Sequence, residues 1–225
     1  MATVTRAPLV VRTNKRGSND RNSRLAHHGW FNYWRTETSL AYRGTLAFEF
    51  LTLAAVHPSV RDIRQHAEPV WFWNGGDWEE YRPRYELVLA TDLPGVTRRV
   101  DVEVLSSVEL RQERLKYRRI ARECRKEGRR FLVFTERQVH AESRLTNAEL
   151  VLTQAGEGLV SDHDLEQVRQ AVDEGLSLTL NGLVAKGVLQ YPRAYAAVLN
   201  LVARGEISFR PSRRFDGNTP LLGRS

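Results

Sequence analysis

The chain of 225 residues has one cysteine, Cys124, and no run of about 18 apolar residues. A single thiol cannot form an intramolecular disulfide or anchor a cysteine-rich zinc site, so we expect Cys124 to be a small core residue. The lack of a long apolar run predicts no membrane-spanning helix, and the first residues lack the apolar core of a secretion signal. We therefore expect a cytoplasmic protein without a membrane partner.

Several signatures of catalysis are missing too. The sequence has no Gly-rich phosphate loop and no nucleophile elbow. Its six histidines show no ligand spacing on any one element. We therefore expect neither a resident cofactor nor a histidine-based metal site.

Acidic residues are fewer than basic ones, with 27 Asp and Glu against 34 Lys and Arg, a net charge of +7 and a pI near 9.9. This excess favours a polyanionic partner. It is concentrated in three segments: residues 1–30, residues 109–130, and a C-terminal tail that contains Arg213 and Arg214. The first has six basic residues against Asp20 and no hydrophobic periodicity, so we expect a flexible basic arm.

The middle basic segment has a helical pattern. Six arginines recur at steps of three or four residues: Arg111, Arg114, Arg118, Arg122, Arg125 and Arg129. We call them the arginine stripe. On one helix ended by Gly128 they would form a single row able to follow a phosphate backbone. The alternative is a solvated face, partly neutralised by Glu113, Glu123 and Glu127.

The central elements predict an α/β fold. A helix is expected over residues 40–55, ended by His57-Pro58, and strands over 70–73, 85–90, 100–105 and 131–134. Asn74-Gly75-Gly76-Asp77 indicates a hairpin, and the helix before residue 131 allows a crossover to a parallel strand. We expect a mixed sheet flanked by helices. The aromatic residues 30–34 are predicted either to stack on bases or to seal the core.

From residue 146 onward, the sequence predicts smaller helices. Helices are expected over residues 162–174, 180–186 and 195–204, then a strand over 205–210 and a basic loop with Arg213 and Arg214. This order fits either a DNA-binding winged helix or a small helical domain that only packs on its neighbours. The predicted organisation is a basic arm over 1–30, an α/β domain over 31–142 and a small helical domain over 146–225.

Short motifs between residues 40 and 140 resemble those of a known family. They are His57-Pro58-Ser59-Val60, Ile63, Gln65-His66, Tyr81-Arg82-Pro83-Arg84, Val102-Glu103-Val104-Leu105 and the stretch from Phe131 to Arg137. In order and spacing they resemble the N-terminal domain of the TnsA transposon endonucleases, in the PD-(D/E)xK restriction-endonuclease-like superfamily. The resemblance covers under half of the chain. It implies a restriction-endonuclease-like mixed sheet, DNA as a partner, and a transposase or phage assembly protein as a further one.

The chain departs from this family at its catalytic positions. Ala47 stands at the helical Glu, Arg84 at the metal-binding Asp and Leu105 at the Lys, which leaves only Glu103. Such sites gather carboxylates around Mg²⁺, and an arginine at the centre repels the ion. The resemblance therefore implies a DNA-binding pseudo-nuclease in which Arg84 pairs with Glu103 and binds phosphate.

Two alternatives stay open. Glu86 and Asp101 share strand faces with Arg84 and Glu103, so Glu86, Asp101 and Glu103 could form a relocated catalytic site for Mg²⁺ in an active DNA endonuclease. Glu49 is predicted to point away from such a site. The other alternative is a scaffold whose basic surface binds acidic protein.

Overall fold

The computed structural model describes residues 28–65, 67–93, 95–156, 158–175 and 179–223. Most of the predicted basic arm lies outside these residues, and residues 28–30, which we assigned to it, belong instead to the first strand. No helix in the described ranges is both long and apolar enough to cross a membrane.

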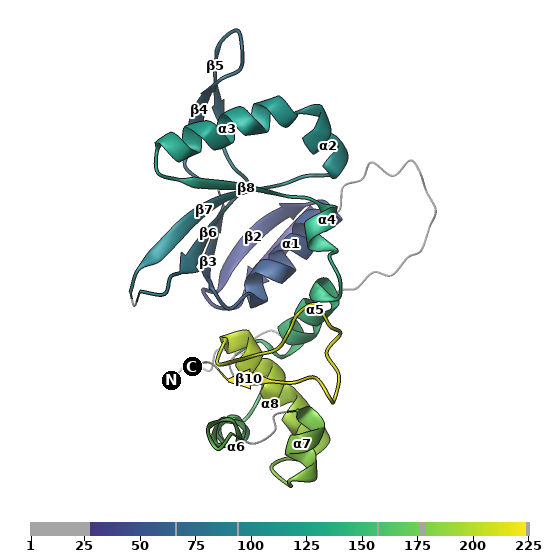
Figure 1. Cartoon of the computed structure of the whole chain (residues 1–225). Helices are drawn as coiled ribbons and strands as arrows, with labels where there is room; N and C mark the ends of the chain where they lie inside the picture. Colours follow the sequence, from purple (N-terminus) through teal and green to yellow (C-terminus); the bar gives the residue numbers. More distant parts are fainter. Residues whose placement is uncertain (1–27, 66, 94, 157, 176–178, 224–225) are drawn as a thin grey trace, which may run out of the picture.

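A four-stranded mixed sheet forms the centre of the first part of the chain. Its strands are β3 (Val60–Gln65), β6 (Tyr85–Ala90), β7 (Thr97–Val104) and β8 (Arg130–Phe134), in the order β3-β6-β7-β8. The first three are antiparallel, and β8 runs parallel to β7. A parallel neighbour requires a crossover, which helices α2 (Ser107–Gln112) and α3 (Arg114–Lys126) supply (Figure 1). The expected mixed sheet flanked by helices is confirmed.

The two faces of the sheet differ in chemistry. Helix α1 (Thr45–Val56) packs Phe50 and Leu51 against the buried Val100, Val102 and Val104 of β7 on one face. On the other face, Ile120 and Cys124 of α3 close a smaller core. The predicted core role of Cys124 is confirmed, because its side chain is fully buried. The alternate residues of β6 and β7 point to this second face, and they include the acidic ones.

The expected helix over residues 40–55 is wrong in its first turn. Residues 38–43 form strand β2 (Thr38–Arg43), paired antiparallel with β1 (His28–Tyr33), and Gly44 at φ 90° breaks the chain before α1. Within the aromatic stretch, Phe31 and Tyr33 are buried, whereas Trp30 is 70% exposed. These aromatic residues therefore mainly seal the core.

The strand over residues 70–73 forms, but outside the central sheet. This strand, β4 (Val70–Trp73), pairs with β5 (Trp78–Tyr81) in a separate hairpin around Asn74-Gly75-Gly76-Asp77. The third antiparallel place in the main sheet belongs to β3, which we did not predict. The hairpin packs Val70 and Phe72 onto α3 and leaves Trp71 and Trp73 outside.

The rest of the chain is mainly helical. It contains α4 (Glu136–Val139), α5 (Arg144–Gln154), α6 (Asp162–Asp173), α7 (Leu180–Ala185) and α8 (Tyr191–Arg204), followed by the short antiparallel pair β9 (Ile207–Ser208) and β10 (Leu222–Gly223). The three predicted helices are confirmed, although α8 begins four residues earlier than expected. The strand expected over 205–210 is limited to residues 207–208. Ser161 caps α6, because its side chain accepts from the backbone N–H of Asp164.

Helix α8 is the centre of this second part. Its buried residues include Ala194, Val198, Leu199 and Leu201, and they pack among α5, α6 and α7. Helix α5 lies between the two parts and contacts both α1 and α8 (Figure 1). The guanidinium of Arg35 joins them as well, because it donates to the carbonyls of Val60 and of Ala203.

Candidate nucleic-acid interface

Three carboxylates lie on the sheet face that is turned away from α1. They are the predicted catalytic residues Glu86, Asp101 and Glu103, and all three are buried. Glu86 of β6 stands directly opposite Asp101 of β7 in the antiparallel register, and Glu103 follows two residues later on the same face. Buried carboxylates are stable only when they are paired or hydrogen-bonded, so their partners decide what this face can do.

Glu103 is held by a tyrosine and an arginine. The Tyr81 hydroxyl donates to its Oε2 at 2.5 Å, and Arg84 Nε lies 3.2 Å from its Oε1. Burial, and then the charge of Glu103, raise the pKa of Tyr81, so the phenol remains a donor at neutral pH. The predicted pairing of Arg84 with Glu103 is confirmed. Arg84 keeps 39% of its side chain exposed, which leaves part of the guanidinium open to solvent.

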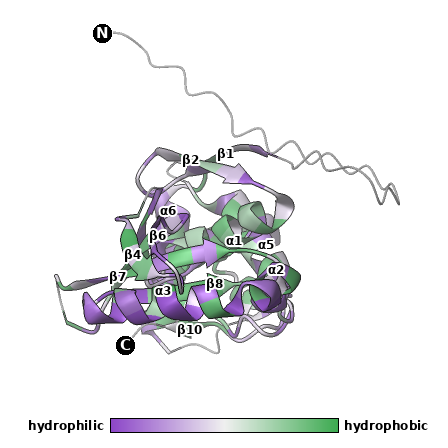
Figure 2. Ribbon diagram, turned by 90° about the horizontal axis from the view of Figure 1, so that it is seen from above, coloured by the Kyte–Doolittle hydropathy of each residue, from purple (hydrophilic) through white to green (hydrophobic). Residues whose placement is uncertain are grey.

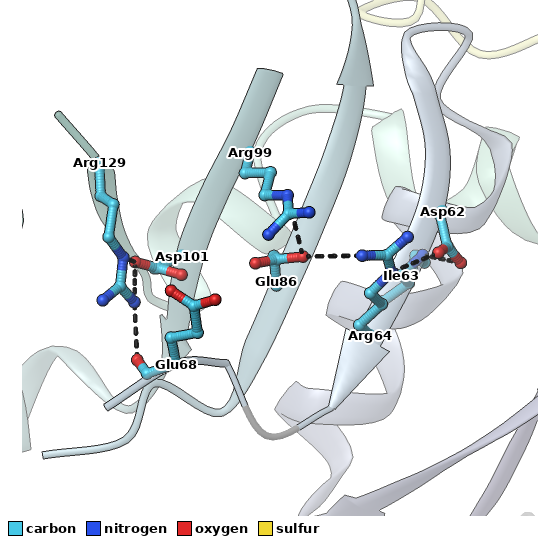
Figure 3. A network of polar contacts seen from close by, with 8 residues as sticks. All are labelled: Asp62, Ile63, Arg64, Glu68, Glu86, Arg99, Asp101 and Arg129. Carbon is cyan, nitrogen blue, oxygen red and sulfur yellow. Dashed lines mark hydrogen bonds and ion pairs between the residues drawn. The ribbon is translucent and has the colours of Figure 1, made fainter. Parts of the chain in front are cut away.

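Asp101 is held by the last arginine of the stripe. Arg129 approaches its Oδ2 with Nη2 at 2.7 Å and Nε at 2.9 Å, and it also donates to the carbonyl of Glu68 at 2.7 Å (Figure 3). Burial raises the pKa of Asp101, and Arg129 opposes the shift. The Arg129 side chain is 18% exposed and that of Asp101 3%, so this pair is largely removed from water.

Glu86 is flanked by two further arginines. Arg64 Nη1 lies 3.5 Å from its Oε1, and Arg99 Nε lies 4.0 Å from the same oxygen (Figure 3). Arg64 also binds Asp62 at 2.7 Å. Both arginines are at least half exposed, so the pairs they form with Glu86 are weaker than the buried pair of Asp101.

The predicted relocated catalytic site does not form a cation cage. Each of its three carboxylates faces its own arginine or arginines, and among the described residues no group of three His, Cys, Asp or Glu side chains is placed to hold a metal ion. Glu49 binds His140 at 2.7 Å, away from this face as predicted. Ala47 and Leu105 are buried apolar residues. The chemistry of this face is charge pairing.

The arginine stripe is divided between two helices and a turn, which corrects the single helix we predicted. Arg111 belongs to α2, and Arg129 lies beyond the end of α3, where Gly128 adopts φ 73°. Arg111, Arg114, Arg118, Arg122 and Arg125 are exposed. Figure 2 shows that α3 is largely hydrophilic.

The acidic residues of the segment neutralise little of the stripe. Glu113 binds Lys116, Glu123 binds Arg122 and Lys126, and Glu127 binds Arg129. Within the part of the chain that the structure describes, no carboxylate pairs with the other four arginines of the stripe, Arg111, Arg114, Arg118 and Arg125. Four exposed, uncompensated guanidinium groups therefore lie along α2 and α3.

The two arginines predicted in the C-terminal loop are also exposed. Arg213 and Arg214 lie between β9 and β10, and the loop is fixed by Asn147, whose amide donates to the carbonyls of Pro211 and Arg213 at 2.9 and 2.7 Å. The backbone N–H of Phe215 donates to the same side chain at 2.9 Å. The loop is therefore anchored to α5 while its arginines point to solvent.

Sequence reasoning missed the arginines that neutralise Glu86 and Asp101. The spacing of the arginines places Arg129 in the helical row, although Gly128 ends the helix just before it. The parallel pairing of β7 and β8 brings residue 130 opposite Val100, and therefore brings Arg129 beside Asp101. Arg64 and Arg99 carry no local signal, because they meet Glu86 only through the register of β3, β6 and β7.

In comparisons with known proteins, no family model and no curated protein matches the chain.

Proposed function

We propose that this chain is a DNA-binding pseudo-nuclease related to the TnsA transposon endonucleases, acting in a DNA-mobilising or DNA-handling assembly of a transposon or a phage. The order α1, β3, β6, β7, α3, β8 supports a restriction-endonuclease-like core, because that core places a helix on each face of such a sheet.

The ion pair of Arg84 with Glu103 is the observation that carries the proposal. A site that cleaves DNA with Mg²⁺ needs carboxylates free to bind the ion. Here a cation of the protein itself occupies the position beside Glu103, and Arg129 takes the same place beside Asp101. An arginine bound to a carboxylate still presents free N–H donors, so the half-exposed Arg84 can bind a phosphate.

The exposed arginines supply the binding surface. Arg114, Arg118 and Arg125 lie along α3 without a carboxylate partner among the described residues, and a row of such charges releases counterions from DNA. In the second part, three helices followed by an antiparallel strand pair fit a winged helix. Because α8 packs its residues from Ala194 to Ala203 largely into the core, we assign the DNA contact there to the exposed Arg213 and Arg214 in the loop between β9 and β10.

Salt-dependent binding tests the proposal. The affinity of the purified protein for a labelled 30-base-pair duplex is measured by fluorescence anisotropy between about 50 and 200 mM salt. Replacing Arg118 and Arg125 with Ala should lower the log–log slope by about 1.8, since each phosphate contact contributes about 0.9. The matched control replaces Arg61 and Lys186, which are exposed and outside α3, and its slope should stay that of the unmodified chain.

A cleavage assay tests the second half of the proposal. Supercoiled plasmid incubated with the protein and Mg²⁺ or Mn²⁺ should stay intact. Nicking that is abolished by Glu103→Ala would instead establish the active endonuclease. A protein without any DNA affinity at about 50 mM salt would leave only the scaffold that binds acidic protein.

A further inference from the structure

Strand β8 is the outer strand of the central sheet and lacks the usual protection of an edge. Within the described residues its only strand partner is β7, and the four residues after Arg130 are Phe131, Leu132, Val133 and Phe134. All four are partly exposed, whereas Val100 to Val104 of the neighbouring strand are buried. Natural edge strands are normally blocked by charges, proline or a bulge, because free backbone groups pair readily with another chain.

The free backbone groups of β8 belong to two residues. The carbonyl of Phe134 accepts from Leu105, so the backbone of Phe134 points toward the β7 side. Peptide groups alternate along a strand, which turns the N–H and C=O groups of Phe131 and Val133 to the open side. An added strand would form its ladder with these two residues.

A groove runs along this open edge, with a volume of about 380 Å³. We call it the edge groove. Its floor is apolar and consists of Leu110, Tyr117, Ala121, Phe131 and Val133. No residue of β7 lines it, so it opens outward from β8, beneath α2 and α3. This is where the inward side chains of a fifth strand would lie.

The rim of the edge groove is basic. Arg111, Arg114 and Arg118 line it, and no carboxylate among the described residues pairs with any of them. The positive charge of this rim determines which kind of segment can bind in the edge groove. A second copy of β8 would bring the same three arginines and Arg130 against the first set. Residues 1–27 carry six Lys and Arg against one Asp, so this segment would also be repelled.

We propose that the edge groove binds an extended acidic segment of a partner protein, which adds a strand to β8. Its backbone pairs with Phe131 and Val133, its alternate apolar side chains fill the floor, and its carboxylates meet Arg111, Arg114 and Arg118. A phosphate backbone could use the arginines but would leave the apolar floor and the free strand edge without contacts. The bound segment covers Arg114 and Arg118 and thereby competes with DNA for that part of α3.

Direct binding of defined peptides tests this assignment. The probe is a fluorescein-labelled heptapeptide in which Glu or Asp alternates with Val or Ile. One comparison peptide carries Lys at each acidic position, and a second consists of Glu alone. We expect the alternating acidic peptide to bind at least about tenfold more tightly than either, since it alone combines the carboxylates with a strand pattern.

Two pairs of charge reversals locate the site. Arg111→Glu with Arg114→Glu, on the rim, should weaken the alternating peptide by about tenfold or more. Arg122→Glu with Arg125→Glu changes the charge equally on the far half of α3 and should cost less than about threefold. Val133→Asp, which places a carboxylate at the strand edge, should weaken the alternating peptide at least as much as the rim reversals do. Circular dichroism confirms that each variant is folded.

Three results would overturn the assignment. The first is equal binding of the all-Glu peptide, which would indicate attraction between charges alone. The second is an equal effect of the two reversal pairs. The third is a dimer by light scattering that Val133→Asp dissociates, which would assign the edge to a second copy. DNA affinity is measured separately on the same variants, so a failure of peptide binding leaves the DNA proposal intact, and the reverse also holds.

Discussion

Removal of the Arg129 charge is expected to destabilise the fold strongly. Arg129 pairs with the buried Asp101 through contacts of 2.7 and 2.9 Å, and it also binds the carbonyl of Glu68. Arg129→Met keeps most of the aliphatic stem and leaves Asp101 as a buried charge opposite Glu86. Breaking a buried pair in this way costs about 3–5 kcal/mol, and we expect about 3 because Arg129 retains some exposure.

Urea denaturation at pH 7 measures this cost as a shift of the midpoint at constant slope. Arg129→Met combined with Asp101→Asn should recover most of the loss, since the second change removes the orphaned charge. The loss should also shrink as the pH falls. The pKa of Asp101 is already raised in the folded chain, and without Arg129 it rises further, so the folded state takes up the proton before the unfolded state does.

The reasoning would be refuted by either of two results. A loss below about 1 kcal/mol for Arg129→Met would show that the pair is effectively solvated. A double variant no more stable than Arg129→Met would show that the cost comes from lost packing or lost backbone hydrogen bonds and not from the Asp101 charge. Arg122→Met is the matched control. It removes an exposed arginine of α3 and should change stability by less than about 0.5 kcal/mol.

Two further predictions concern stability and reactivity. Arg169 holds Glu206 through two contacts of 2.7 and 3.0 Å and lowers the pKa of Glu206. This pair therefore stabilises the fold above the pKa that Glu206 has in the unfolded chain, and the stabilisation is lost as the pH falls through the lower folded pKa. Glu206→Gln should therefore cost about 1 kcal/mol at pH 7, since the pair is about one-third exposed, and almost nothing at pH 3; an equal loss at both pH values in urea titrations would contradict the assignment. Burial raises the pKa of Cys124 to about 11, so a thiol reagent at pH 8 should label it only when the chain unfolds, and labelling of the native protein at the rate of a free thiol would show that α3 is not packed as described.

The central fold could be predicted wherever hydrophobic pattern and local structure agree. The alternating residues of β7, the hairpin at Asn74-Gly75-Gly76-Asp77 and the helix end at Gly128 are of this kind. Strand β5 was missed because Trp-Glu-Glu-Tyr has no buried face of its own and is extended through its pairing with β4. The sequence predicts one helix over β2 and α1 because Leu40 continues the helical spacing. Only the backbone conformation of Gly44 separates the strand from the helix.

The candidate site was predictable in its residues but only partly in their pairing. Arg84 meets Glu103 because β6 and β7 are consecutive antiparallel strands joined by one hairpin, and their register brings the two residues together. Asp101 and Arg129 are 28 residues apart in the sequence, and their contact depends on the parallel register of β7 and β8. The edge groove has no sequence signal of its own, because it exists only where α2 and α3 extend over the outer strand of the sheet.

The position of Arg35 has a consequence for how the chain responds to stress. Its guanidinium spans from β3 to the end of α8, and Trp34 beside it packs against the hydrophobic cores of both parts. If either part unfolds, the other part loses the buried contacts that Trp34 and Arg35 make with it. The chain should therefore lose its structure as a single cooperative unit, with one calorimetric transition, even though its two cores look like separate modules.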